Sequence, residues 1–180
     1  MAEDTADADP FDFENLYAKE NDALQAFLSE HGALALYHLG GSLNWDFCDR
    51  TILWVVQNPD CPKATASRIF WQSGAEFRAT NPGESYGRAN EIMDTVLRRW
   101  KVGEYRHEDW ADPEPDMTRY EIDYYRNSEG VHAAGNPLGI PDDLFIVVEG
   151  TIPPRPAVLH PGQNAELDAI LLDLGMFYRD

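Results

Sequence analysis

The chain has 180 residues, of which 43% are hydrophobic and 26% are charged, so it can bury one sizeable core without disulfides or a structural metal. Lys and Arg number 14 against 32 Asp and Glu, which gives a formal net charge of −18 at pH 7. This charge argues against nucleic acid and membrane surfaces as partners, and it favours either a basic protein partner or simple solubility.

The first ten residues contain four acidic side chains and no basic one, and they offer almost nothing to bury. We expect residues 1–10 to form a disordered acidic tail and residues 11–180 to form a single helical domain. The start lacks the basic residues of a secretory signal, no run is apolar enough to cross a bilayer, and only two cysteines occur. These features predict a cytoplasmic protein that is not bound to a membrane.

Apolar periodicity, interrupted by glycine and proline, predicts short helices in the first half of the chain. A docking helix is expected over residues 11–17, followed by a helix that Asn21 caps and Gly32 ends. A third apolar stretch, residues 33–39, stops at a pair of glycines, and helix resumes over residues 51–57.

Three further helices are predicted on the same grounds. Asp60 is expected to cap a helix that ends at Gly74, and the strongest period covers residues 87–101. A helix over residues 117–125 follows an acidic, proline-containing stretch.

The C-terminal third is less uniform. Residues 144–148 fit either a buried strand or a helix, and we favour a helix because of the boundary signals around them. Four prolines between 153 and 161 predict an extended segment, and a last helix is expected to end at Gly175. The predicted fold is mainly α: one compact multi-helix domain, with room for one or two short strands in this third.

Charge is unevenly distributed along the chain. Basic residues concentrate between Lys63 and Lys101, and acidic residues follow at once between Glu104 and Asp116. We expect these two groups to pair within the molecule, and the alternative is a basic patch that faces a ligand.

The densest polar and aromatic cluster comprises Asn44, Trp45, Asp46 and Asp49. The structural interpretation is that Asp46 or Asp49 caps a helix beginning near residue 50, with Asn44 in a turn and Trp45 as a buried anchor. The functional interpretation is a site for a divalent cation or a general base.

The same region resembles a known family. The stretches 43–46, 52–56, 58–61, 64–66 and 69–71, which read LNWD, ILWVV, NPDC, ATA and IFW, are similar to the bacterial domain of unknown function 4274 over about residues 33–74. Phe47 and Cys48 replace the acidic and glycine residues that usually follow the Asn-Trp-Asp in that family. The resemblance implies a bacterial helical domain, and it implies no reaction.

No catalytic motif or cofactor-binding motif is present. The five histidines lack metal-ligand spacing, and no phosphate-binding loop or serine nucleophile motif occurs. Cys61 precedes a proline at a helix start, where it could be a nucleophile, but core filling is the simpler role. We therefore predict no metal and no cofactor.

Aromatic side chains within the acidic region between residues 104 and 129 suggest a binding surface for a basic partner. The candidate binding residues are Tyr105, Trp110, Tyr120, Asp123 and Tyr124. The leading hypothesis is a non-enzymatic protein-binding module, similar to an immunity protein or antitoxin. The alternative is a small hydrolase-like enzyme or a cation-binding protein that uses the Asn44–Asp49 cluster.

Overall fold

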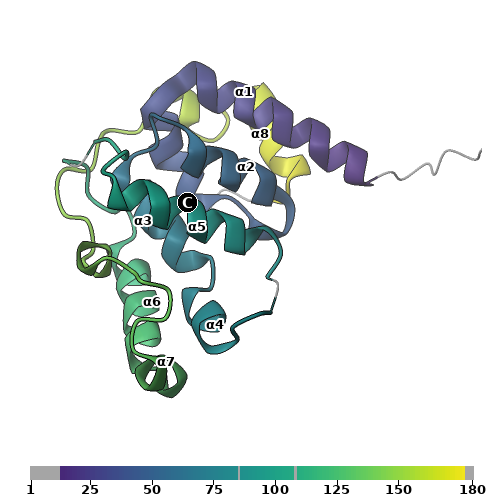
Figure 1. Ribbon diagram of the computed structural model, residues 1–180. Coiled ribbons are helices and arrows are strands. Elements are labelled where there is room, and N and C mark those ends of the chain that lie inside the picture. Colours follow the sequence, from purple (N-terminus) through teal and green to yellow (C-terminus); the bar gives the residue numbers. More distant parts are fainter. Residues whose placement is uncertain (1–12, 85, 108, 177–180) are drawn as a thin grey trace, which may run out of the picture.

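The computed structural model describes residues 13–84, 86–107 and 109–176 and confirms the mainly helical single domain (Figure 1). The predicted tail over residues 1–10 lies outside the described residues. The α-helices are α1 (Phe13–Leu39), α2 (Trp45–Gln57), α3 (Lys63–Gln72), α4 (Ala75–Thr80), α5 (Arg88–Lys101), α6 (Pro115–Asn127), α7 (Glu129–Ala134) and α8 (Ala165–Asp173). Three short 3₁₀ turns connect them: η1 (Gly40–Ser42), η2 (Asp142–Phe145) and η3 (Ala157–Leu159).

The core forms where α1, α2, α3 and α5 pack together. Apolar residues at spacings of three and four place one face of α5 against α2, with Ile92, Met93 and Val96 fully buried. Burying a side chain of this size stabilises the fold by roughly 1.5–3 kcal/mol relative to exposing it. In Figure 1, α6 and α7 lie below this core beside α4, and α8 lies against α1.

The first two predicted helices form one continuous element. Asn21 was expected to be a cap, but it lies inside α1 with only 3% of its surface exposed. Its amide nitrogen donates to the carbonyls of Tyr17 at 2.7 Å and Phe47 at 2.8 Å, and its oxygen accepts from the Thr51 hydroxyl at 2.6 Å. The side chain therefore joins α1 to α2. Gly32 does break the helix, as a kink with φ 63°.

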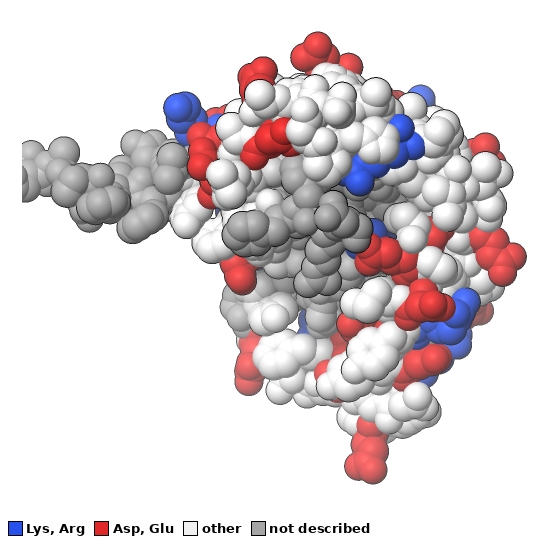
Figure 2. All heavy atoms as spheres, turned by 180° about the vertical axis from the view of Figure 1, so that it is seen from behind, with Lys and Arg blue, Asp and Glu red and all other residues white. Residues whose placement is uncertain are grey.

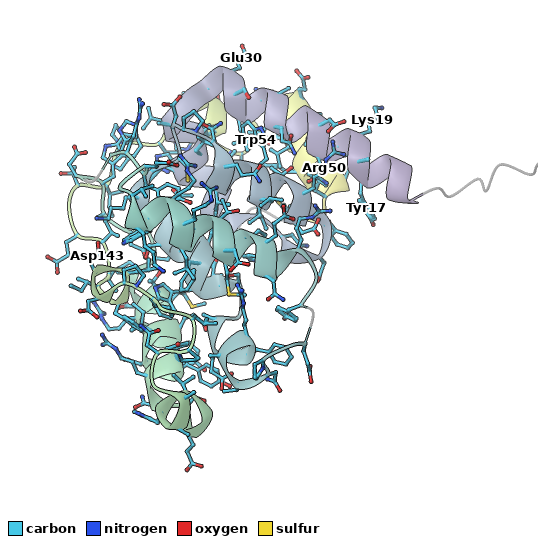
Figure 3. The ribbon with its side chains drawn as sticks, in the orientation of Figure 1. Tyr17, Lys19, Glu30, Arg50, Trp54 and Asp143 are labelled. Atoms are coloured by element: carbon cyan, nitrogen blue, oxygen red, sulfur yellow. The ribbon has the colours of Figure 1, made fainter. Side chains whose placement is uncertain are left out.

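A surface ion pair also joins α1 to α2. Figure 3 shows Arg50 of α2 directly below the first part of α1, and its guanidinium lies 2.8 Å from the Asp22 carboxylate. Both side chains are about half exposed, so the pair contributes little compared with the buried Asn21 contacts.

Two predicted helix starts need correction. α2 begins at Trp45 rather than near residue 50, and its cap is Asn44, whose side-chain oxygen accepts from the Asp46 amide at 2.9 Å. α3 begins after Pro62, whereas the Asp60 amide donates to the Asn58 side chain at 2.9 Å in the preceding turn. An asparagine therefore caps α2 in place of the predicted aspartate, whereas α3, which follows Pro62, begins without a side-chain cap.

The helix favoured over residues 144–148 is absent. η2 ends at Phe145, Ile146 has extended backbone, and Val147 and Val148 belong to neither a helix nor a strand. The Leu144 carbonyl accepts from the Trp71 indole at 3.0 Å, and the Val148 carbonyl accepts from the Asp112 amide at 2.8 Å. Because these carbonyls bind groups elsewhere in the fold, they are not used in a local helix. In the described part of the chain, strand-like pairing is limited to two isolated bridges, Pro62 with Arg106 and Trp110 with Thr151.

Candidate functional site

The outer face of α6 carries two exposed aromatic side chains. Tyr120 is 62% exposed and Tyr124 is 53% exposed, and their rings are nearly parallel with centroids 6.3 Å apart. Asp123 is exposed beside them, while Thr118, Ile122 and Tyr125 on the opposite side of the helix are buried. Three of the five predicted binding residues, Tyr120, Asp123 and Tyr124, therefore share one exposed face. Together with the exposed Asp116 one turn earlier, they form what we call the α6 face.

The other two predicted binding residues are packed into the molecule. Tyr105 is 4% exposed, and its hydroxyl donates to the Val56 carbonyl at 3.0 Å. Trp110 is half-buried between the rings of Tyr37 and His107, with centroid distances of 5.4 and 4.3 Å. These contacts hold the loop between α5 and α6 against the core, and they do not place either ring on the α6 face.

The residues of the polar cluster at positions 44–49 do not form a single site, because two of them line a cavity and the two aspartates do not. Asn44 caps α2, and Asn44 and Trp45 line a cavity that is described below. Asp49 accepts from Arg88 at 3.0 Å, and Asp46 is exposed in the first turn of α2. One residue of the cluster thus caps a helix, as the structural interpretation expected of an aspartate, but the capping residue is Asn44.

A cavity of about 760 Å³ lies where the end of α1, η1, α3, the start of α6 and the end of α8 meet. Its polar lining includes His38, Asn44, Arg68, Gln72, Glu121 and Arg155. Leu43, Trp45, Met117 and Leu171 supply apolar surface. The lining is therefore mixed, with polar and charged side chains forming at least as much of the wall as apolar ones. The volume falls within the range of roughly 300–1,000 Å³ that is common for small-molecule sites.

Arg68 is held firmly in the cavity wall. Its side chain is 6% exposed, and its guanidinium lies 2.8 Å from the Glu114 carboxylate. With the Gln72 amide oriented to satisfy both of its neighbours, the Gln72 oxygen accepts from Arg68 Nε at 3.2 Å and the nitrogen donates to the Gly41 carbonyl at 3.2 Å. Gly41 permits this approach because a Cβ there would lie 3.0 Å from the Arg68 side chain.

Two other charges in the cavity wall are without partners among the described residues. Arg155 makes no ion pair or hydrogen bond there, and its Nε atom is enclosed. Glu121 also makes no ion pair or hydrogen bond within the described chain, and partial burial raises its pKa above the ordinary value. Desolvation by burial lowers the pKa of His38 below its ordinary value, and the nearby charge of Arg155 acts in the same direction, while the backbone of Pro154 partly opposes it.

The basic residues between Lys63 and Lys101 are largely paired with acids. Arg68 binds Glu114 and Arg99 binds Glu104 at 2.9 Å, as the sequence predicted, while Arg78 of α4 binds Asp94 of α5 at 2.7 Å on the surface. Lys63 Nζ lies 3.8 Å from Asp143, which is labelled on the outer edge in Figure 3. Arg68 and Arg99 thus pair with the acidic stretch as expected, whereas Lys63, Arg78 and Arg88 pair with acids elsewhere in the chain. Figure 2 shows acidic side chains distributed over the opposite face of the molecule, with basic ones in fewer places.

Cys48 and Cys61 are core residues. Both are 0% exposed, and burial raises the pKa of each thiol to about 12. A thiol with so high a pKa stays protonated at pH 7 and is a poor nucleophile, so core filling is the role that the structure gives Cys61.

Within the described residues, no three His, Cys, Asp or Glu side chains are close enough together to hold a metal ion. None of the helices in that same part of the chain combines the length and the apolar character needed to cross a bilayer.

Sequence reasoning did not find the cavity. Arg68, Glu121 and Arg155 lie far apart in the sequence and belong to no short motif. Two features of the sequence pointed to this region. The glycine pair at 40–41 permits close packing against Arg68, and Asn44 and Trp45 belong to the polar cluster that the sequence analysis had singled out.

Comparison with known proteins adds one match. No curated protein and no solved structure matches the chain significantly. A comparison with family models does give a match, and it covers residues 33–97. This segment begins after the Gly32 kink and ends within α5, so it contains His38, Asn44 and Arg68 of the cavity lining but neither Glu121 nor Arg155. The predicted resemblance is confirmed and extended: residues 33–97, less than half of the chain, match the model of a domain of unknown function (DUF4274).

Proposed function

We propose that this chain is a non-enzymatic, cytoplasmic protein-binding module that receives a basic segment of a partner protein on the α6 face, in the manner of an immunity protein or antitoxin. The observation that carries the proposal is the exposed, nearly parallel pair Tyr120 and Tyr124. Tyrosines are enriched among the residues that contribute most to binding, and a cationic side chain gains further energy over an aromatic ring.

The charges around this pair favour a basic partner. At 100° per residue, Asp116 and Asp123 fall on the same side of α6 as the tyrosines, whereas Arg119 and Arg126 fall on the flank. Arg119 pairs with Asp116 at 2.8 Å, so among the described residues Asp123 supplies the unpaired acidic charge of this face. Arg126 is turned toward the ring of Phe145, with 5.0 Å between the guanidinium carbon and the ring centroid. The net charge of −18 adds long-range attraction that would speed encounter with a basic partner.

The test is a titration with a panel of soluble lysine- and arginine-rich peptides that also carry leucine or tyrosine, measured by isothermal calorimetry at low and high salt. We expect the double substitution Asp123→Lys with Tyr124→Ala to weaken the tightest peptide at least tenfold, which corresponds to about 1.4 kcal/mol. Binding should weaken as salt is raised, because part of the attraction is electrostatic.

The chain offers a matched control near the end of α8, where Leu172 and Asp173 are an adjacent exposed apolar–acidic pair. The variant Leu172→Ala with Asp173→Lys changes the net charge by the same amount, so it corrects for nonspecific attraction to an acidic protein. Equal weakening in both double variants would show that the α6 face is not the interface. If no peptide in the panel binds, the proposal that the chain receives a basic segment of a partner is wrong.

A further inference from the structure

We infer that the cavity between α1, α3, α6 and α8 binds a short peptide with a free amino group, a free carboxylate and apolar side chains. This small-ligand site is separate from the α6 face, and it does not rest on the function proposed for that face. The inference follows from which charges in the cavity wall are already satisfied and which are not.

The Arg68 charge is satisfied within the protein. Glu114 neutralises its guanidinium at 2.8 Å, and Gln72 accepts from its Nε. These two groups therefore form a neutral part of the wall that is fixed before any ligand binds.

Arg155 and Glu121 remain as unpaired charges of opposite sign lining the same cavity. Arg155 is half-buried, and its enclosed Nε lacks a hydrogen-bond partner in the described part of the chain. An enclosed donor without a partner is unfavourable, and a ligand carboxylate would give the guanidinium a charge-assisted hydrogen-bond partner that the described chain does not supply.

Glu121 supplies the complementary charge. Its carboxylate is half-buried, and the desolvation that raises its pKa is not offset by any basic neighbour in the described chain. A ligand ammonium group would offset it. A simple anion would leave Glu121 facing a second negative charge, and a simple cation would leave Arg155 facing a second positive one.

The rest of the lining suits apolar side chains of the ligand. Leu43 and Trp45 at the start of α2, Met117 of α6 and Leu171 of α8 border the cavity from three different parts of the fold. The volume of about 760 Å³ exceeds what a single charged group needs, so a short peptide fits these observations better than an isolated ion.

The experiment uses the full chain and leucyl-leucine in three forms: with both ends free, with the amino end acetylated, and with the carboxyl end amidated. We expect the free dipeptide to raise the thermal midpoint and to bind measurably in calorimetry. Each blocked form should bind at least tenfold more weakly, because it leaves one wall charge without a partner.

Two variants test which end of the dipeptide binds to which charged residue. Arg155→Gln should weaken the free dipeptide at least tenfold and change binding of the amide little, whereas Glu121→Gln should weaken the free dipeptide and change binding of the acetylated form little. Arg119→Gln is the control, because Arg119 is an exposed arginine of α6 already paired with Asp116 at 2.8 Å. Far-UV circular dichroism of each variant separates lost binding from lost folding.

Several results would overturn the inference: no binding of the free dipeptide, equal binding of all three forms, or undiminished binding by a folded Arg155→Gln variant. The double variant Asp123→Lys with Tyr124→Ala should retain dipeptide binding. The two proposals can therefore fail independently.

Discussion

The guanidinium of Arg68 lies 2.8 Å from the carboxylate of Glu114, and the arginine is 6% exposed while the glutamate is 50% exposed. This ion pair ties α3, inside the segment that matches the family model, to the start of α6, outside it. Since a buried guanidinium without a counter-charge is strongly unfavourable, the pair fixes where α6 begins relative to the core.

Removing the partner of Arg68 should destabilise the fold. We expect Glu114→Ala to lower the free energy of unfolding by about 1–2 kcal/mol, less than for a fully enclosed pair because water reaches Glu114. Urea denaturation followed by circular dichroism measures the change. The control Asp22→Ala removes the exposed partner of Arg50 and should cost less than about 1 kcal/mol; an equal loss in both variants would contradict the role given to Arg68.

Asn21 should be among the most sensitive polar positions. The substitution Asn21→Ala removes hydrogen bonds to the Tyr17 and Phe47 carbonyls and to Thr51, and it leaves the buried Thr51 hydroxyl without its closest partner. We expect a loss of about 2–4 kcal/mol in urea denaturation. Gln25→Ala, which removes a single 3.3 Å bond to the same hydroxyl, should cost under about 1 kcal/mol.

Gly150 should tolerate no side chain. It has φ 150°, and a Cβ built there would lie only 2.2 Å from the Asp109 carbonyl oxygen. We expect Gly150→Ala to cost at least about 2 kcal/mol, because the bridge between Trp110 and Thr151 must open to relieve the clash. Gly162→Ala is the comparison: its φ is 74° with no atom within 4 Å, so we expect only the backbone cost of about 1 kcal/mol.

Stability should fall at alkaline pH because of the buried thiols. The ordinary thiol pKa is 9.0, and burial raises the pKa of Cys48 and Cys61 to about 12. Between these values the unfolded chain releases protons that the folded chain keeps, so the free energy of unfolding decreases as pH rises through this window. Each thiol contributes a slope approaching about 1.4 kcal/mol per pH unit.

Urea denaturation from about pH 8 to pH 10.5 measures this dependence. The double variant Cys48→Ala with Cys61→Ala should show a shallower decline, although not a flat one, because burial also raises the pKa values of Tyr37, Tyr105 and Tyr125. An unchanged slope in the double variant would contradict the assignment to the thiols.

Many of the helix ends and breaks could be predicted because they depend on the local sequence. Gly32, Gly74 and Gly175 all adopt positive φ at or near helix ends, a conformation that the residue type itself favours. The apolar period of α5 likewise predicts its buried face, and Thr118, Ile122 and Tyr125 of α6 are buried at the same spacing that leaves Tyr120 and Tyr124 outside.

What could not be predicted depends on partners distant in the sequence. The Asn21 side chain bonds to residues 26 and 30 positions away, and the Leu144 carbonyl accepts from an indole 73 positions away. Tyr105 and Tyr120 occur in the same acidic region, but only the first has the Val56 carbonyl within reach of its hydroxyl. The cavity is likewise assembled from residues that no short pattern connects.

The packing around Trp71 has a consequence for any polypeptide limited to the matched segment. Its indole, inside the matched segment, donates to Leu144 and contacts the rings of Tyr125 and Phe145, with centroids 5.7 and 5.3 Å away, and all three partners lie outside that segment. A polypeptide limited to residues 33–97 would expose this large aromatic surface to water and would be prone to aggregate. We therefore expect proteins built on that segment alone to shield the equivalent surface with another domain or a second copy, a task that residues after 97 perform in this chain.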